Sequence, residues 1–306
     1  LPRLPTPARR RSLRLLVTGA GGLLGSEFVG LRSEGAGPEI IGLTRAQLDV
    51  TAADEADQVI GHHRPDWVVH CAAYTAVDRA EEEPQEAMRV NHGGTVNVAA
   101  AAARHRARLL YISTDYVFDG RKGAPYLPSD PVNPLSVYAR TKRAGEEAAL
   151  AAGGVSVRTG WLYGAGGGNF VDAILRRAQA GERLRVVHDQ RGRPTWARNV
   201  ALGVVELLSG SVAGHVARGL DGVWHLADGG DATWLELART ALRLRGLRTE
   251  VAGVPSQEWG AAASRPAYSV LDVAATEAAL ARPMMPWWTA LESYLSGTPG
   301  ASTGRV

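Results

Sequence analysis

A predicted strand that leads directly into a glycine-rich turn, close to the start of the chain, restricts the fold more than any other feature. Residues 14–18 form the predicted strand, and Gly19, Gly22 and Gly25 follow it in a G-x-x-G-x-x-G pattern before a predicted helix at 26–32. Such glycines let the backbone turn tightly and present the amides of a helix N-terminus to a pyrophosphate. The pattern therefore favours a dinucleotide-binding unit over a plain turn.

Predicted strands and helices alternate at short intervals along the rest of the chain. The strands are expected at 39–43, 66–73, 109–112, 155–161 and 222–227, and the helices at 52–62, 84–103, 133–152, 170–179, 199–208 and 233–244. This alternation is typical of a parallel sheet with helices on both faces. We therefore predict an α/β fold with a Rossmann-type doubly wound parallel sheet and a smaller C-terminal substrate lobe.

The chain has 306 residues, 45% of them hydrophobic, which is enough to bury a large core. We assign 13–157 and about 196–234 to an NAD(P)-binding Rossmann domain, and about 158–195 and 235–306 to the substrate-binding lobe. Residues 1–12 are interpreted as a flexible basic extension. Glycines interrupt the apolar stretch that follows it and no small-residue cleavage site comes after, so we do not interpret it as a signal peptide.

Composition excludes several classes of protein. The net charge is +3, and basic and aromatic residues do not cluster, so we expect no nucleic-acid partner. No apolar run is long enough to predict a membrane span. Cys71 is the single cysteine, which excludes an internal disulfide framework and favours a reducing compartment, and we expect a cytoplasmic protein. Neither His70 nor Cys71 has a companion at metal-ligand spacing, so no metal ligands are assigned.

The second predicted strand, 39–43, ends where dinucleotide-binding folds place the residue that meets the adenosine ribose. An acid there would bind a 2′-hydroxyl and repel a 2′-phosphate, but this chain has Thr44 and Arg45. This favours NADPH over NADH, with NADH left open as the alternative. Asp49 and Val50 are candidates for the adenine edge.

The stretch from Ser113 to Lys142 carries the predicted chemistry. A buried strand ends at Ser113 and Thr114, and the dipeptide at 133–134, Asn-Pro, predicts the start of a helix. Tyr138 and Lys142 then lie four positions apart on one helix face. We expect the ammonium to favour ionisation of the phenol, which gives a proton donor for a carbonyl beside a hydride source.

Six motifs give the chain a family resemblance. In order, they are H-C-A-A-Y-T-A-V-D-R-A-E (70–81), S-T-D-Y-V-F-D-G (113–120), Y-A-R-T-K-R-A-G-E (138–146), R-T-G-W-L-Y-G (158–164), D-Q-R-G-R-P-T (189–195) and R-P-A-Y-S-V-L-D (265–272). With them the chain resembles the extended short-chain dehydrogenase/reductases, and within these the dTDP-4-dehydrorhamnose reductase family. The resemblance covers nearly the whole chain beyond the first dozen residues.

The resemblance implies roles for individual residues. Thr114 would bind the keto oxygen, Tyr138 would protonate it, and Lys142 would hold the nicotinamide ribose. The cofactor-binding candidates are Gly19, Gly22, Leu23, Leu24, Gly25, Arg45, Asp49, Val50, Ala72, Ala73, Tyr74, Tyr138 and Lys142. The substrate-binding candidates are Thr114, Asp115, Val117, Tyr138, Trp161, Asn169, Phe170, Gln190, Arg193 and Pro194, with Arg193 as our own candidate for a diphosphate contact.

The implied reaction is reduction of the 4-keto group of a dTDP-4-dehydro-6-deoxy-L-hexose, from dTDP-4-dehydro-L-rhamnose to dTDP-L-rhamnose. Ala139 replaces the family's usual glycine and Pro128 a common acid, so reduction of another dTDP-sugar, such as dTDP-dihydrostreptose formation in an antibiotic pathway, is an alternative. A second alternative is a non-catalytic NADP-binding regulatory subunit. An epimerase or dehydratase is disfavoured because Asp115 is the sole acid beside Thr114.

Two further properties of the family stay open. Some members bridge two subunits through Mg²⁺, and the sequence does not let us assign its ligands in this chain. A homodimer is an open alternative to a monomer.

Overall fold

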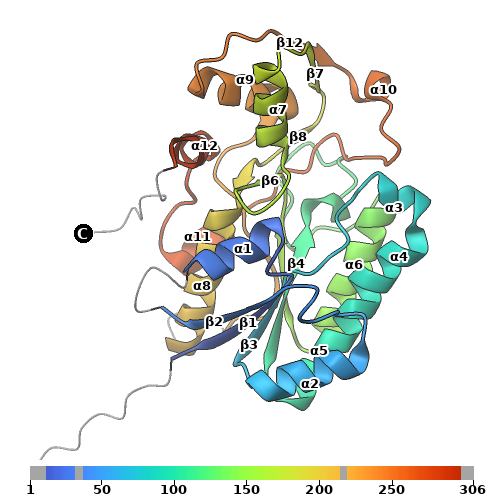
Figure 1. The fold of residues 1–306 in the computed structure, drawn as a ribbon, viewed down its shortest axis with the longest axis vertical. Helices are drawn as coiled ribbons and strands as arrows, with labels where there is room; N and C mark the ends of the chain where they lie inside the picture. Colours follow the sequence, from blue (N-terminus) through green and yellow to red (C-terminus); the bar gives the residue numbers. More distant parts are fainter. Residues whose placement is uncertain (1–11, 32–36, 214–218, 298–306) are drawn as a thin grey trace, which may run out of the picture.

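The computed structural model describes residues 12–31, 37–213 and 219–297, so the predicted basic extension lies almost entirely outside the described residues. Six parallel strands form the central sheet in the order β10-β5-β4-β3-β1-β2 (Figure 1). They are β1 (Arg14–Thr18), β2 (Glu39–Leu43), β3 (Trp67–His70), β4 (Arg108–Thr114), β5 (Val155–Thr159) and β10 (Gly222–His225). From β1 the chain first adds β2 on one side and then adds β3 on the other side. This change of side places a crevice between the carboxyl ends of β1 and β3.

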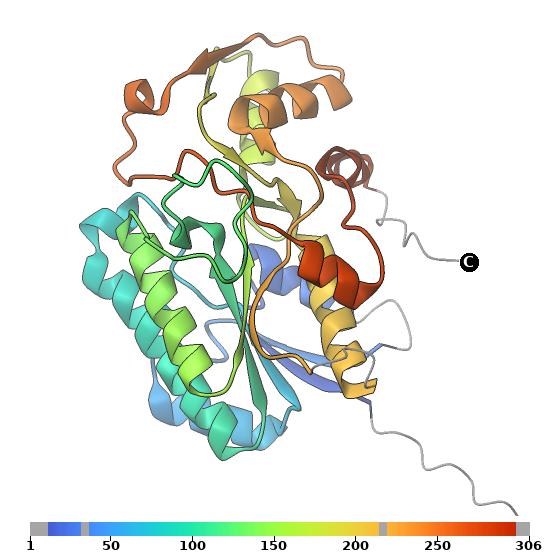
Figure 2. The same cartoon turned by 180° about the vertical axis from the view of Figure 1, so that it is seen from behind.

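Helices cover both faces of this sheet (Figures 1 and 2). One face carries α1 (Leu23–Gly30) and α8 (Ala197–Ala213), and the other carries α2 (Ala53–His63), α5 (Gly94–Arg104) and α6 (Val137–Ala151). An apolar core lies on each face, one with Phe28 and Val204 and the other with Ile60 and Tyr111. The prediction of a doubly wound Rossmann-type α/β fold is confirmed.

A second group of elements stands above the carboxyl edge of the sheet (Figure 1). It contains α7 (Phe170–Gln179), α9 (Trp234–Leu244), α10 (Ser256–Trp259), α12 (Trp287–Ser296) and the parallel pair of β7 (Leu184–Val187) and β12 (Val251–Val254). Its apolar core includes Val171, Leu237 and Leu291. Two-residue strand pairs join it to the sheet region: β6 (Leu162–Tyr163) with β9 (Thr195–Trp196), and β8 (Arg191–Gly192) with β11 (Ala232–Thr233).

Helix α11 (Ala274–Leu280) lies beside α8, on the sheet side of the molecule (Figure 2). Its residues Ala279 and Leu280 pack against the core between the sheet and α8. Part of the segment 235–306, which was predicted to belong to the lobe, therefore packs against the sheet region. The division of the chain into two domains stays a prediction.

The predicted helix 84–103 is interrupted by one wide turn. It consists of α4 (Pro84–Met88), a π-helical turn (Arg89–Gly93) and α5, and the short helix α3 (Arg79–Glu82) precedes it. A π-helical turn holds one more residue than an α-helical turn and is frequent at functional sites. Asn91 lies in this turn and is 1% exposed.

The start of α6 differs from the prediction. Its N-cap is Ser136, whose hydroxyl accepts a hydrogen bond from the amide of Ala139 at 3.2 Å. Asn133 lies outside this helix: its backbone amide donates to the carbonyl of Val117, and its side-chain nitrogen donates to Asp119. The helix therefore begins three residues after Pro134 rather than at it.

Several other predicted ends were wrong by a few residues. The helix expected from residue 26 begins at Leu23, directly after the Gly22 N-cap. The strands expected to end at 73, 161 and 227 end at His70, Thr159 and His225. The helix expected at 199–208 extends over Ala197–Ala213. The ends at Leu23, His70 and Thr159 lie where the carboxyl edge of the sheet opens into loops that line the cleft described below.

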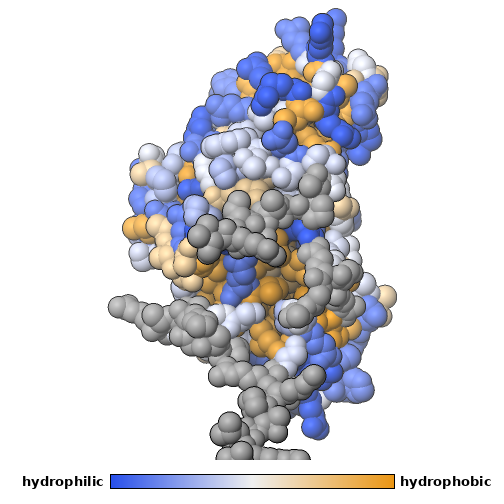
Figure 3. All heavy atoms as spheres, turned by 90° about the vertical axis from the view of Figure 1, so that its left-hand side faces the viewer, coloured by the Kyte–Doolittle hydropathy of each residue, from blue (hydrophilic) through white to orange (hydrophobic). Residues whose placement is uncertain are grey.

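Two tryptophans of this second group of elements lie at its surface. Trp259 is 49% exposed and Trp288 is 50% exposed, whereas Trp287 is buried. Seen from the side of α12, the end of the molecule farthest from the sheet has mainly hydrophilic residues with hydrophobic ones among them (Figure 3).

No helix among the described residues combines the length and the apolar character needed to cross a membrane.

Candidate functional site

A cavity of about 1290 Å³ lies over the carboxyl edge of the sheet, at the reversal point between β1 and β3. Its walls come from the glycine turn, the ends of β2, β3 and β4, helix α6 and the beginning of α7. All thirteen predicted cofactor-binding residues line it: Gly19, Gly22, Leu23, Leu24, Gly25, Arg45, Asp49, Val50, Ala72, Ala73, Tyr74, Tyr138 and Lys142. Segments far apart in the sequence therefore converge on one cleft.

Gly19 and Gly25 stand at positions of the glycine turn where a side chain has no room. Gly19 has a φ of +67°, and a Cβ atom there would stand 2.7 Å from the amide nitrogen of Ala72. A Cβ on Gly25 would stand 2.2 Å from the carbonyl oxygen of Gly19. The turn thus brings bare backbone to the floor of the cavity and points the N-terminus of α1 into it, which suits the pyrophosphate of a dinucleotide.

The rim of the cavity near β2 carries Arg45, whose side chain is exposed. Hydrogen bonds from Thr51 hold the pKa of the neighbouring Asp49 carboxyl below its usual value, with Arg45 and Arg89 contributing a smaller lowering. Asp49 is therefore ionised at neutral pH. Its oxygen accepts from the Thr51 hydroxyl at 2.8 Å, which fixes the loop beneath the rim.

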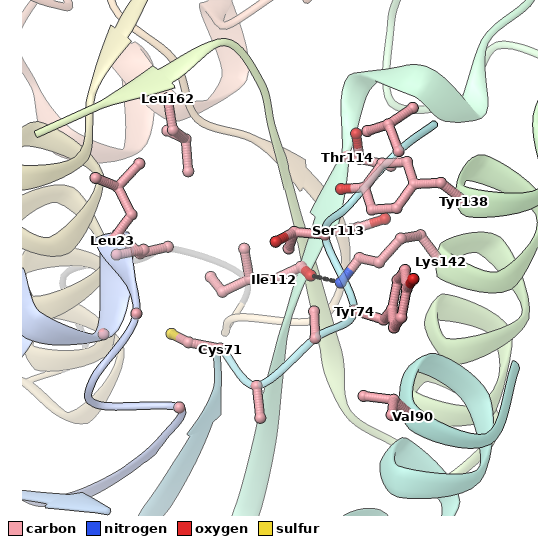
Figure 4. A pocket seen from close by; sticks show the side chains of 18 of the residues that line it. Leu23, Cys71, Tyr74, Val90, Ile112, Ser113, Thr114, Tyr138, Lys142 and Leu162 are labelled. Carbon is pink, nitrogen blue, oxygen red and sulfur yellow. Dashed lines mark hydrogen bonds between the residues drawn. The ribbon is translucent and has the colours of Figure 1, made fainter. Parts of the chain in front are cut away.

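The hydroxyl-bearing end of β4 and one face of α6 meet at the centre of the cleft. Thr114 is the last residue of β4, and Tyr138 and Lys142 project from α6 toward it (Figure 4). The Lys142 ammonium donates a hydrogen bond to the carbonyl of Ile112 at 2.6 Å and lies 4.2 Å from the centre of the Tyr111 ring. The three predicted catalytic side chains therefore lie together, and their roles stay predictions.

The electrostatics of this group differ from the expectation that the ammonium makes the phenol easier to ionise. Burial raises the pKa of Tyr138 to about 12, although its hydrogen bond with Thr114 lowers it in part. Burial also lowers the pKa of Lys142 to about 7. Desolvation dominates the pKa of Tyr138, and the Lys142 ammonium is bound to the carbonyl of Ile112 rather than to the phenol.

Asp115 follows Thr114 and is 3% exposed. Its carboxyl is 2.5 Å from the Ser269 hydroxyl, which donates to it, and 3.2 Å from the Thr114 hydroxyl. A Cβ atom on Gly160 would stand 2.3 Å from this carboxyl, so the glycine of R-T-G-W leaves the space that Asp115 fills. Burial raises the pKa of Asp115 to about 7.

Asn91 supports the floor of the cleft from below. Its side-chain oxygen accepts from the amide of Tyr74 at 2.8 Å, and its side-chain nitrogen donates to the Tyr74 carbonyl at 3.1 Å. The same nitrogen donates to the Thr141 hydroxyl at 3.0 Å. One side chain in the π-helical turn thus joins the loop after β3 to helix α6.

Aromatic side chains close the end of the cleft near the second group of elements. The ring of Trp161 stacks on that of Trp234, with ring centres 3.6 Å apart and planes 2° from parallel. Phe170 contacts Trp234 from the side, and Asn169 caps α7. Trp161, Asn169 and Phe170 line the cavity as the substrate-binding prediction requires.

A second cavity of about 510 Å³ adjoins this aromatic group, since Phe170 and Trp234 line both cavities. Three guanidinium groups border it, those of Arg177, Arg185 and Arg265. The predicted substrate residue Gln190 lines this second cavity, where its side chain bonds Ser256 and Trp234.

Three predicted substrate residues line neither cavity: Val117, Arg193 and Pro194. Val117 is fully buried in a small core beside Phe118. Arg193 donates to the carbonyl of Asp228 at 3.0 Å, and this contact joins the D-Q-R-G-R-P-T loop to the chain after β10. Arg193 therefore connects two segments of the chain and lines neither cavity. Its predicted contact with a diphosphate does not follow from this position.

Sequence reasoning missed two residues of the site. Trp234 forms half of the stacked pair, and Arg265 borders the second cavity and binds Asp78 through both of its terminal nitrogens. The R-P-A-Y-S-V-L-D motif pointed to Arg265, but nothing in the sequence placed it beside Asp78. Among the described residues, no group of three His, Cys, Asp or Glu side chains is arranged to hold a metal ion.

The parallel sheet, the glycine turn and the Thr-Tyr-Lys group define an extended short-chain dehydrogenase/reductase. The model of the RmlD substrate binding domain family matches residues 13–298. The chain belongs to this family, that of the dTDP-4-dehydrorhamnose reductases.

Three comparisons show how far the similarity extends. The chain is 42% identical to a dTDP-4-dehydrorhamnose reductase of Streptomyces griseus over 92% of this chain and 93% of that one. It is 40% identical to a dTDP-4-keto-6-deoxy-D-glucose reductase of Streptomyces niveus over 91% and 95%. The crystal structure of dTDP-4-dehydrorhamnose reductase from Bacillus anthracis in complex with NADP matches with a TM-score of 0.86, 33% identity, and coverage of 94% of this chain and 100% of that one.

Proposed function

We propose that this chain reduces the 4-keto group of a dTDP-4-dehydro-6-deoxy-L-hexose with NADPH, converting dTDP-4-dehydro-L-rhamnose to dTDP-L-rhamnose. The observation that carries the proposal is the convergence of Thr114, Tyr138 and Lys142 on a cavity that also contains the glycine turn. The reductases among the relatives support the reaction class.

The reduced nicotinamide supplies the hydride when it is bound. Tyr138 donates its proton to the oxygen that becomes an alkoxide, and Thr114 donates a hydrogen bond to the same oxygen. Both interactions strengthen as negative charge builds on this oxygen, so they lower the barrier. Burial, which raises the pKa of Tyr138 to about 12, keeps the phenol protonated at neutral pH, where it still gives up its proton to the more basic alkoxide.

The remaining lining residues fit the two ends of the cofactor. Gly19 and Gly25 allow the tight turn that presents backbone to a pyrophosphate, and Lys142 provides an ammonium for the nicotinamide ribose. Arg45 stands at the rim where a 2′-phosphate would lie, which favours NADPH. The NADP bound to the relative from Bacillus anthracis supports this choice.

We assign the sugar to the aromatic end of the first cavity and the nucleotide to the second cavity. The stacked Trp161 and Trp234 form a flat apolar wall between them. Arg177, Arg185 and Arg265 border the second cavity, and each is paired with a carboxylate, of Glu182, Glu258 and Asp78 respectively. A diphosphate bound there would exchange contacts with these carboxylates for contacts with the guanidinium groups. A cytoplasmic location and a homodimer remain predictions.

Ketoreduction of a different dTDP-sugar is the second candidate, favoured by the name of the relative from Streptomyces niveus. The same side chains would perform it, and the sugar would be selected by the walls around Trp161. Ala139, which replaces the usual glycine, is 1% exposed and faces the core rather than the cleft. Pro128 contacts Arg158 through its carbonyl, 3.3 Å away, so neither departure changes a lining residue.

The deciding experiment measures loss of NADPH or NADH absorbance with a panel of dTDP-4-ketosugars. We expect turnover with dTDP-4-dehydro-L-rhamnose, and faster turnover with NADPH than with NADH. Preference for another ketosugar would select the second candidate. Tight cofactor binding without turnover of any ketosugar would favour the regulatory-subunit alternative and contradict the proposal.

A further inference from the structure

The hydroxyl of Thr114 has one hydrogen but three polar neighbours, from Tyr116, Asp115 and Tyr138. The amide of Tyr116 donates to Thr114 Oγ1 at 3.2 Å, and Asp115 Oδ1 lies 3.2 Å away. The hydroxyl of Tyr138 faces the same oxygen atom (Figure 4). A hydroxyl has one hydrogen and two lone pairs, so only one of these contacts uses its hydrogen.

The charge of Asp115 decides where that hydrogen points. A carboxylate only accepts hydrogen bonds, so an ionised Asp115 draws the Thr114 hydrogen away from the cavity. A protonated Asp115 donates to Thr114 Oγ1, and the Thr114 hydrogen is then free for an oxygen in the cavity. Only the second arrangement gives a substrate oxygen two donors, Thr114 and Tyr138.

No ion pair of Asp115 occurs within the described part of the chain, and the backbone amides of Asp115 and Tyr116 also bond its carboxyl. Ser269, from the segment between β12 and α11, donates to Oδ2 at 2.5 Å, and the chain after β5 presents only the backbone of Gly160. Helix α6 contributes Tyr138 and Lys142, whose ammonium is bound to Ile112. The turn after β4 contributes Tyr116, beyond which lies Arg265.

We propose that Asp115 is a positioning residue that carries a proton during the reduction, donates a hydrogen bond to Thr114 Oγ1, and so directs the Thr114 hydrogen to the substrate oxygen. The proposal rests on the proposed function, because it concerns the oxygen that is reduced. Ser269 keeps the carboxyl in register with Thr114.

The proposal implies a dependence on pH. Burial raises the pKa of Asp115 to about 7, and the hydrogen bond from Ser269 lowers it in part. Below this pKa the carboxyl is protonated and Thr114 is correctly oriented. Turnover should therefore fall as the pH rises through about 7. Removal of the Ser269 hydroxyl should raise the pKa and move the fall to higher pH.

The kinetic experiment compares pH profiles of kcat for three variants. Asp115→Ala removes the group that orients the Thr114 hydroxyl but draws its hydrogen nowhere else. Its kcat should therefore fall by less than the cost of losing one donor to the reacting oxygen, which is about 100-fold. Asp115→Asn has an amide that donates to Thr114 and never ionises, so it should recover most of that loss and show no fall near pH 7. Ser269→Ala should shift the fall to higher pH. Asp119→Asn is the matched control, because Asp119 lines neither cavity. It should keep the native pH profile of kcat.

A second measurement requires no substrate. The carboxyl ¹³C signal of Asp115, assigned by its absence in Asp115→Asn, should titrate near pH 7 in the native chain and at higher pH in Ser269→Ala. A signal that stays ionised down to pH 5 would overturn the proposal, as would a fall in kcat that persists in Asp115→Asn, because Lys142 would then cause it. A native chain that reduces no ketosugar contradicts the proposed function instead, whatever the titration shows.

Discussion

The carboxylate of Asp78 accepts two hydrogen bonds from the guanidinium of Arg265, at 2.9 and 2.7 Å, although 187 positions separate them in the sequence. The amide of Ala263 donates to the same carboxylate at 3.0 Å. These contacts join the loop after β3, which borders the cofactor cavity, to the segment that carries Ser269. They therefore connect the wall of the first cavity at Val77 and Arg79 to the wall of the second cavity at Arg265.

Asp78→Asn should lower the free energy of unfolding by about 1 kcal/mol, because Asp78 is half exposed and solvent screens the pair. The hydrogen bond from Arg265 lowers the pKa of Asp78, so its stabilisation is present above the unfolded value of 3.8 and is lost as pH falls through the lower folded value. Denaturant unfolding at pH 7 and in acid should show a difference between variant and native chain that shrinks in acid. A difference that grows in acid would contradict this.

Glu146→Gln should be more damaging, at about 3–5 kcal/mol, because it leaves the buried guanidinium of Arg158 without its counter-charge. Arg158 donates to Glu146 at 2.7 and 3.0 Å, and the side chains are 2% and 0% exposed. Urea unfolding measures the loss. Glu182→Gln removes the partner of Arg177 at the surface and should change the midpoint little. Equal losses in the two variants would contradict the prediction.

Tyr138→Phe should lower kcat by about 100- to 10,000-fold, since it removes the proton donor and little volume. Binding of NADPH, followed by its fluorescence, should stay close to native because the glycine turn is unchanged. Tyr126→Phe is the matched control: Tyr126 is buried in the small core beside Phe118 and lines neither cavity. Unchanged turnover in Tyr138→Phe would remove the assignment.

Arg45→Ala should weaken NADPH binding by about tenfold and leave NADH binding unchanged, because only NADPH carries the 2′-phosphate. The exposed position of Arg45 makes the contact sensitive to salt, so added salt should narrow the native preference for NADPH. Dissociation constants for both cofactors at two ionic strengths measure this. An equal loss for NADPH and NADH would place Arg45 elsewhere than at the phosphate.

Local signals predicted most of the sheet. Strands β1 and β2 and helix α7 have the predicted ends, because apolar runs and the Asn169 cap act within a few residues. The spacing of Tyr138 and Lys142 predicted that they share a helix face. These features depend on neighbours in the sequence, and a sequence displays them directly.

Features that depend on distant partners were not predictable in this way. Contacts with Val117 and Asp119 hold Asn133 in the loop before α6, and Ser136 is the N-cap of this helix. Trp234 reaches Trp161 only after the chain has folded. The pKa of Tyr138 depends mainly on burial, and the sequence does not report how deeply a side chain is buried.

The contacts of Asn91 depend on the extra residue in the π-helical turn at Arg89–Gly93. Deleting one residue there would restore a regular α-helix and rotate what precedes it by about 100° relative to α5. Asn91 could not then reach the Tyr74 peptide and Thr141 together. A deletion that makes the helix more regular would thus break the connection between the loop after β3 and helix α6. The local irregularity of the helix therefore fixes the positions of two walls of the cleft relative to each other.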